Sequence, residues 1–216
     1  MTISATTQGI RPGVATSSTR PAVPFDGQVI FETDTENLKA YNGSAWVTQN
    51  ALQYITGATF TSVTSVSLPA NTFTATYTNY LVQFYATADG AEALMTSRFR
   101  ASGSDNTTSN YSYAALGRYS NANDAGTEGN AVSSFGMRGI FTGLPGSHTL
   151  TICEPQTAKK TTVTGMISGN SASGLALVTT LAFAGIFNAT TSFDSYSFLA
   201  STAITGSYKV YGYSNS

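Results

Sequence analysis

The sequence predicts an all-β protein, namely an antiparallel β-sandwich of jelly-roll type that follows a small β-module. From about residue 58 onward, short segments rich in β-branched and aromatic residues recur between Gly, Pro, Asn and Asp, as in the strands and turns of a sandwich. No segment carries a convincing helical period, so helical crossovers between parallel strands are not expected. Eight or nine strands, roughly, would leave too many edges in one open sheet, and we therefore expect two packed layers.

Residues 25–57 predict a separate module of three short strands. Pro21 and Pro24 keep the approach to it extended, and Asp26-Gly27 is a turn signal. Asn42-Gly43 fits the two positive-φ positions of a type I′ hairpin turn. The expected strands are Gln28–Thr33, Leu38–Tyr41 and Ser44–Val47.

Such a module is too small to be stable alone, because three short strands bury little apolar surface. We therefore expect Phe25, Phe31, Tyr41 and Trp46 to meet a partner surface. That surface belongs to the next domain, to sister subunits or to a larger particle. The alternative is that these four side chains close a small core of their own.

Residues 1–24 lack any period and predict an extended N-terminal arm. The arm has no apolar segment flanked by basic residues and a cleavage site, so a signal peptide is not expected. The predicted organisation is an arm at 1–24, the attachment module at 25–57 and the β-sandwich at 58–216.

Within the sandwich, Asn79–Ala86 alternates strongly and predicts a central strand. In the next strand, Met95 and Phe99 are expected to face inward. Polar loops at 102–110 and 120–130 bracket a strand at Tyr111–Tyr119. Two further segments, Phe135–Thr142 and His148–Glu154, predict a hairpin, and Leu175–Phe187 predicts a core strand that is covered on both sides or lies with one side at a subunit interface.

Composition excludes several functional classes. Charged residues make up 10% of the chain, against about 25% in ordinary soluble domains. A formal net charge of −1 and scattered basic residues argue against nucleic-acid binding. The longest apolar run, Leu175–Phe187, is shorter than the roughly 20 residues that span a bilayer, so no membrane insertion is expected.

The residues that usually carry chemistry are sparse. The chain has one histidine, His148, and one cysteine, Cys153, which leaves no paired histidines and no cysteine cluster for a metal. Cys153 is expected to be a half-buried strand thiol. No catalytic residue, cofactor or metal site is predicted, and we expect a protein that is not an enzyme.

Carboxylates are the remaining catalytic candidates, because a pair of them can cleave glycosides. Asp34 and Glu36 lie in a predicted hairpin loop, and Asp105, Asp124 and Glu128 lie in polar loops where solvated carboxylates are usual. A surface-glycan hydrolase is therefore kept as a third hypothesis.

Two parts of the sequence resemble structural proteins of tailed bacteriophages. One is the module from Pro21 to Val47; the other runs through the body from Tyr77–Tyr80 and Arg98–Gly103 to the closing strand Ile204–Tyr213, with its Val-Tyr-Gly. The resemblance implies a non-enzymatic minor tail, fibre or decoration protein on the outside of the virion, assembled as a homotrimer with other virion proteins as partners.

The first functional hypothesis is a tail-associated fibre or tip protein, anchored by its N-terminal region with the sandwich facing outward. Tyr111, Tyr113 and Tyr119 would then supply stacking surfaces for host glycans, although packing inside the protein or between subunits is the alternative for each. The second hypothesis is a head-decoration protein whose arm binds capsid subunits.

Overall fold

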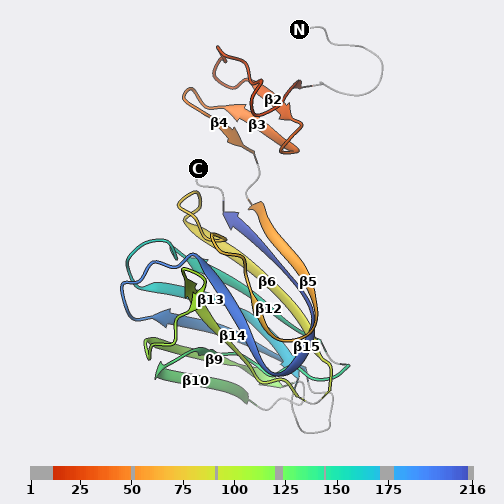
Figure 1. Cartoon of the computed structure of the whole chain (residues 1–216), viewed down its shortest axis with the longest axis vertical. Coiled ribbons are helices and arrows are strands. Elements are labelled where there is room, and N and C mark those ends of the chain that lie inside the picture. The colour runs from red at the N-terminus through yellow and green to blue at the C-terminus, as the bar shows by residue number, and fades with distance from the viewer. Residues whose placement is uncertain are drawn as a thin grey trace. The chain divides into compact units, whose positions relative to one another are not determined.

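A computed structural model describes residues 12–49, 52–90, 92–119, 124–143, 145–170 and 178–213. These residues form strands, turns and loops without a helix, which confirms the predicted all-β class. The chain divides into two compact units, Met1–Ala51 and Leu52–Ser216 (Figure 1).

The small unit is a four-stranded sheet in the order β1-β2-β3-β4. The hairpin strands β2, β3 and β4 pair antiparallel, and β1 adds to β2 in parallel. The bounds are β1 (Gly13–Ala15), β2 (Val29–Glu32), β3 (Asn37–Tyr41) and β4 (Trp46–Thr48). The three predicted strands are present within one or two residues of their expected bounds.

Three details of the small unit differ from expectation. Residues 13–15 form β1, and the segment after it contacts the sheet, where an arm was expected over 1–24. The two units divide after Ala51 instead of after residue 57. The turn at Asn42 is a four-residue loop in which only Gly43 has a positive φ, of 93°, and the Asn42 side-chain oxygen accepts the backbone N–H groups of Ser44 and Ala45.

The larger unit is one large, curled antiparallel sheet (Figure 1). Its strand order is β10-β9-β14-β13-β12-β6-β15-β7-β11, with β5 beside β15 and β8 beside β7. The bounds are β5 (Leu52–Ser67), β6 (Asn79–Ala88), β7 (Met95–Ala101), β8 (Ser104–Asp105), β9 (Tyr111–Tyr119), β10 (Asp124–Val132), β11 (Phe135–Gly136), β12 (Gly146–Cys153), β13 (Thr161–Asn170), β14 (Val178–Phe187) and β15 (Ser195–Tyr213).

Alternation of side chains explains the central strands. In β6, Tyr80, Val82 and Phe84 are buried while Gln83 and Tyr85 are exposed, as the period of two requires. The predicted inward residues of β7, Met95 and Phe99, are buried as well. In β12, Leu150 and Ile152 are buried and Cys153 is half-buried.

The pairing of several segments differs from the sequence-based prediction. The expected hairpin of Phe135–Thr142 with His148–Glu154 is wrong, because β11 pairs with β7 and β12 pairs with β6 and β13. Residues 124–130, expected as part of a loop over 120–130, lie in the edge strand β10. The strand β14 buries Leu181 and Phe183 but exposes Ala182 and Ala184, so it is covered on one side only within this chain.

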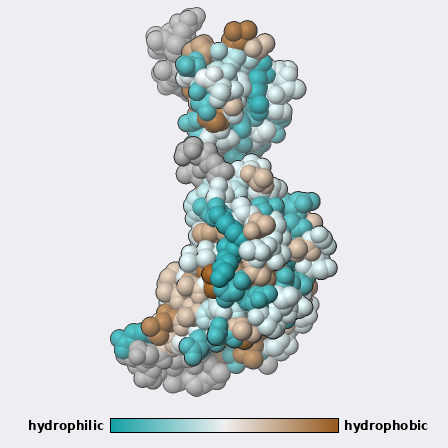
Figure 2. Space-filling view, turned by 90° about the vertical axis from the view of Figure 1, so that its left-hand side faces the viewer, coloured by the Kyte–Doolittle hydropathy of each residue, from teal (hydrophilic) through white to brown (hydrophobic). Residues whose placement is uncertain are grey.

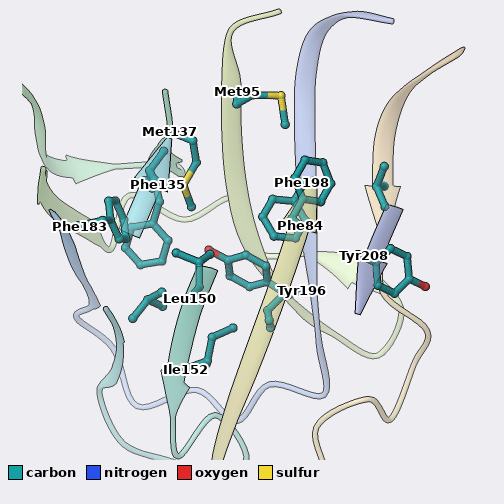
Figure 3. Close-up of a cluster of buried hydrophobic side chains, with 14 of the residues drawn as sticks. Phe84, Met95, Phe135, Met137, Leu150, Ile152, Phe183, Tyr196, Phe198 and Tyr208 are labelled. Carbon is teal, nitrogen blue, oxygen red and sulfur yellow. The ribbon is translucent and has the colours of Figure 1, made fainter. Parts of the chain in front are cut away.

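The curl folds the sheet over a shared core, as in a sandwich. The strand β14 is not a neighbour of β7 or β11 in the sheet, yet their aromatic rings meet. The ring centroids of Phe99 in β7 and Phe187 in β14 are 6.2 Å apart. Those of Phe135 in β11 and Phe183 in β14 are 5.9 Å apart. Figure 3 shows Phe84 and Phe198 lying ring to ring in this core, with centroids 4.2 Å apart. The two end regions of the sheet therefore act as opposing layers.

The structure brings together two segments that carry the resemblance to bacteriophage proteins. The ring of Tyr77 lies on the backbone of Gly212 in the closing strand and edge-on to Tyr80, with centroids 6.0 Å apart. A Cβ at position 212 would come within 2.3 Å of the Tyr77 ring. Glycine at this position therefore makes room for an aromatic side chain.

We expect Gly212→Ala to lower the free energy of unfolding of the larger unit by about 1–3 kcal/mol, because the added methyl displaces the Tyr77 ring from a packed site. Gly126→Ala in the exposed strand β10 is the control, since a Cβ there meets nothing closer than 3.4 Å. Urea unfolding of both variants measures the difference. Equal stability of the two variants would contradict this account of Gly212.

Candidate functional site

The four predicted attachment residues lie in the small unit but do not share one face. Phe31 in β2 is 36% exposed, and Phe25, just before that strand, is 68% exposed. Tyr41 and Trp46 are partly buried on the opposite face of the sheet, with ring centroids 5.5 Å apart. Only Phe25 and Phe31 are therefore largely available to a partner.

Phe31 belongs to an apolar sheet face that sequence reasoning did not delimit. The register places Val14 of β1, Phe31 of β2 and Leu38 of β3 side by side, and Val29 next to Ala40. Val14, Val29 and Leu38 are 53%, 40% and 41% exposed. We call these five residues, together with Val47 opposite Ala40, the Phe31 face; Figure 2 shows brown, apolar areas reaching the surface of the small unit.

The opposite side of the small sheet buries an ionic cluster instead of a large apolar core. The Glu32 carboxylate is fully buried and accepts hydrogen bonds from Arg20 Nε at 2.5 Å and Thr35 Oγ1 at 2.7 Å. Lys39 Nζ lies 3.8 Å from the same carboxylate. The hydrogen bond from Arg20 lowers the pKa of Glu32, against the opposing effect of burial.

A second contact holds the segment after β1. Ser17 donates both its backbone N–H, at 2.9 Å, and its hydroxyl, at 2.5 Å, to the carboxylate of Asp34, and these bonds lower the pKa of Asp34. Besides the backbone pairing of β1 with β2, the side chains of Asp34 and Glu32 thus join residues 13–20 to the β2–β3 hairpin. Asp34, which was considered as a carboxylate for glycoside cleavage, therefore has a structural role here.

Of the three tyrosines expected to face a receptor, the structure describes the side chains of Tyr111 and Tyr113, and neither is exposed. Tyr111 is fully buried, with its ring 5.0 Å from Phe187 and its hydroxyl bonded to the backbone of Asn106. The expectation for Tyr111 is therefore wrong, because the alternation of β9 turns it into the core. Tyr113 is partly buried against Phe135 and Phe183, and the side chain of Tyr119 lies outside the described residues.

Two of the remaining carboxylate candidates, Asp105 and Glu128, lie on different strands, β8 and β10. Asp105 accepts a hydrogen bond from Arg100 at 2.6 Å and from the buried Ser197 hydroxyl at 2.9 Å, which makes it part of the β7–β15 packing. Glu128 is exposed on the edge strand, and the side chain of Asp124 lies outside the described residues. Among described residues, no group of His, Cys, Asp and Glu side chains could hold a metal ion.

The one histidine is part of the core. His148 is fully buried and its ring stacks on Phe84, with centroids 5.6 Å apart. Neither ring nitrogen has a hydrogen-bond partner among the residues that the structure describes. Burial lowers the pKa of His148 to about 4, so the ring is neutral at physiological pH.

Comparison with known proteins finds no match: no family model, no curated protein and no solved structure matches the chain. In the described part of the chain, no helical segment has the length and apolarity that a membrane crossing needs.

We expect Glu32→Gln to destabilise the small unit by about 2 kcal/mol at pH 7, because it removes the buried carboxylate that accepts a hydrogen bond from Arg20 and lies beside Lys39. The pKa of Glu32 is lowered from 4.5 on folding, so its contribution is present above that value and is lost as the pH falls through the folded pKa. The difference between wild type and variant should therefore shrink in acid.

Trp46, the single tryptophan of the chain, reports on this unit by fluorescence during urea unfolding. Glu36→Gln, in the exposed loop of the same hairpin, is the matched control and should leave the transition in place. If Glu32→Gln also leaves the midpoint of urea unfolding unchanged, the structural role of the cluster is refuted.

We expect His148 to make the larger unit less stable in acid. Its pKa is about 6.5 when unfolded and about 4 when folded, so the unfolded chain binds more protons between these values and stability falls as the pH drops below about 6.5. Between pH 7 and pH 4.5 the loss is about 2–3 kcal/mol. His148→Phe keeps the ring stack and should remove this part of the pH dependence in urea unfolding; an unchanged pH dependence would assign it to other groups.

Proposed function

We propose that the protein is a non-enzymatic structural component of a bacteriophage virion. In this proposal it is a tail-associated fibre or tip protein that its N-terminal unit attaches to the particle. The proposal is supported by the resemblance of the Pro21–Val47 module and of the closing strand to bacteriophage particle proteins. The same resemblance implies a homotrimer on the outside of the virion.

The observation that carries the attachment role is the Phe31 face. Four of its side chains, Val14, Val29, Phe31 and Leu38, are at least one third exposed and contiguous in register. Removing apolar surface from water contributes about 25 cal/mol per Å², so a contiguous face of this kind favours a docked partner. The other side of the sheet carries the ion pair of Glu32 with Arg20, in which the Glu32 side chain is fully buried.

Because residues 13–20 are folded into the small unit, the part of the chain that we expect to attach to the particle changes. Residues 13–20 form part of the small unit through β1, Ser17 and Arg20. We therefore assign the attachment to the face of the folded unit and not to a free arm over residues 1–24. A deletion up to residue 24 would remove β1 and Arg20, and with them one edge of that face.

The composition and the sheet of the larger unit suit a stable protein on the outside of a particle. The chain is rich in Ser and Thr, and only 10% of its residues are charged. The large sheet is held by long antiparallel pairings such as β13 with β14 and β15 with β5. A head-decoration protein is the second candidate, because the Phe31 face would serve equally on a capsid. Labelling the protein in imaged particles distinguishes tail from head.

We expect the double variant Phe31→Ser, Leu38→Ser to reduce incorporation of the protein into particles by about tenfold or more, because it removes the centre of the Phe31 face. Incorporation is measured by quantitative immunoblotting of purified particles produced with the variant gene. Unfolding followed through Trp46 checks that the small unit still folds.

The matched control is Leu116→Ser, which replaces an apolar side chain that is 70% exposed on the larger unit. Normal incorporation of the control with loss of the double variant supports the proposal. Normal incorporation of the folded double variant would overturn the assignment of the Phe31 face as the anchor.

A further inference from the structure

The outer face of the large sheet contains a shallow hollow over three adjoining strands. It spans β12, β6 and β15, and the side chains that point into it from the outer face alternate with buried residues such as His148 and Phe84. The outward lining residues are Gln83, Tyr85, Ser147, Thr149, Ser207 and Lys209. All six come from regular strands, so the backbone fixes their spacing.

The register arranges these six side chains in two rows. Tyr85 lies between Ser147 and Ser207, and Gln83 lies between Thr149 and Lys209 in the next row. Tyr85 is 49% exposed although it sits in the middle of the sheet. The hollow thus presents one aromatic ring with a hydroxyl on either side.

The polar groups around the ring are available to a ligand. The side chains of Gln83, Thr149, Ser207 and Lys209 make no hydrogen bond or ion pair with another described residue. Ser147 Oγ lies 2.8 Å from Ser168 Oγ and keeps further hydrogen-bonding capacity, since a hydroxyl has one donor and two acceptor positions. The lining contains no carboxylate, and Lys209 gives it one positive charge.

We propose that this hollow binds a saccharide, with one sugar ring lying on Tyr85. The apolar C–H face of a sugar packs on an aromatic ring, while its hydroxyls need neutral donors and acceptors at the rim. The serine and threonine hydroxyls and the Gln83 amide supply those groups. Lys209 adds a preference for sugars that carry a carboxylate.

A protein partner would fit the hollow less well. Protein interfaces are held by a buried centre of large apolar, aromatic or Arg side chains, whereas Tyr85 is the one large apolar side chain among the outward lining residues. The inference rests on the proposed function only for the source of the saccharide, which would be the host surface. It moves the expected contact from the tyrosines of β9 to Tyr85.

The test is binding of the purified full chain to an array of immobilised bacterial surface glycans, acidic and neutral, followed by titration calorimetry with oligosaccharides of the strongest hit. We expect Tyr85→Ala to weaken binding about tenfold or more, because it removes the stacking surface. Tyr85→Phe should bind like the wild type. Lys209→Gln should weaken binding to acidic glycans and leave neutral ones unchanged.

Leu116→Ala is the control, since Leu116 is 70% exposed on β9, which does not line the hollow. Absence of binding to every glycan, or equal binding by Tyr85→Ala, would overturn the inference. A change in oligomeric state of Tyr85→Ala by light scattering would overturn it too, and would assign the face to a subunit contact. Incorporation of Tyr85→Ala into particles should be normal, so failure here is separable from failure of the anchoring proposal.

Discussion

Contact between aromatic side chains across the curled sheet is the interaction on which the larger unit depends. The ring of Phe135, in the two-residue strand β11, packs on the rings of Tyr111 and Phe183, with centroid distances of 4.8 Å and 5.9 Å. Phe99 stacks on Phe193 at 4.6 Å. Gly185 permits the approach of Phe135, because a Cβ there would lie 2.6 Å from the ring. Without these contacts the sheet would have no second layer, and its inner face would remain in water.

The small unit is built on a different principle. In the described part of the small unit, Ile30 is the one large apolar side chain that is buried. The fully buried Glu32 occupies a position where an aliphatic residue would be expected. A buried carboxylate is tolerated only when hydrogen bonds and opposite charge replace its water, which Arg20, Thr35 and Lys39 provide. This arrangement leaves the aliphatic residues on the other face, where they remain exposed.

The sequence was sufficient where the signal was local. The alternation of Asn79–Ala86 and the polar segments that bracket Tyr111–Tyr119 predicted two strands that the structure contains. Met95 and Phe99 were correctly expected to face inward. Partners were not predictable, because β11 pairs with β7 from nearly forty residues earlier in the chain. Residues 124–132 have the Gly and Asn content of a loop, and an exposed edge strand tolerates it.

The candidate site was less predictable than the fold. Phe31 was singled out for its aromatic ring. Leu38 joins it through the antiparallel pairing of the predicted β2–β3 hairpin, but Val14 joins it through the parallel β1–β2 pairing, which no local pattern predicts. Tyr111 and Tyr85 both lie in segments that read as strands in the sequence. Which of them faces water is decided by the curl of the sheet, and the structure buries the first and exposes the second.

The pairing of Leu52 with Tyr213 has a mechanical consequence. These residues are the first of β5 and the last of β15, so the chain enters and leaves the larger unit at the same end of one strand pair. A pull applied between these two points would open the β5–β15 hydrogen bonds one after another. A pull between Leu52 and the far end of the sheet would instead load those bonds together in shear. The β5–β15 pair should therefore resist a pull along its strands better than a pull that separates Leu52 from Tyr213.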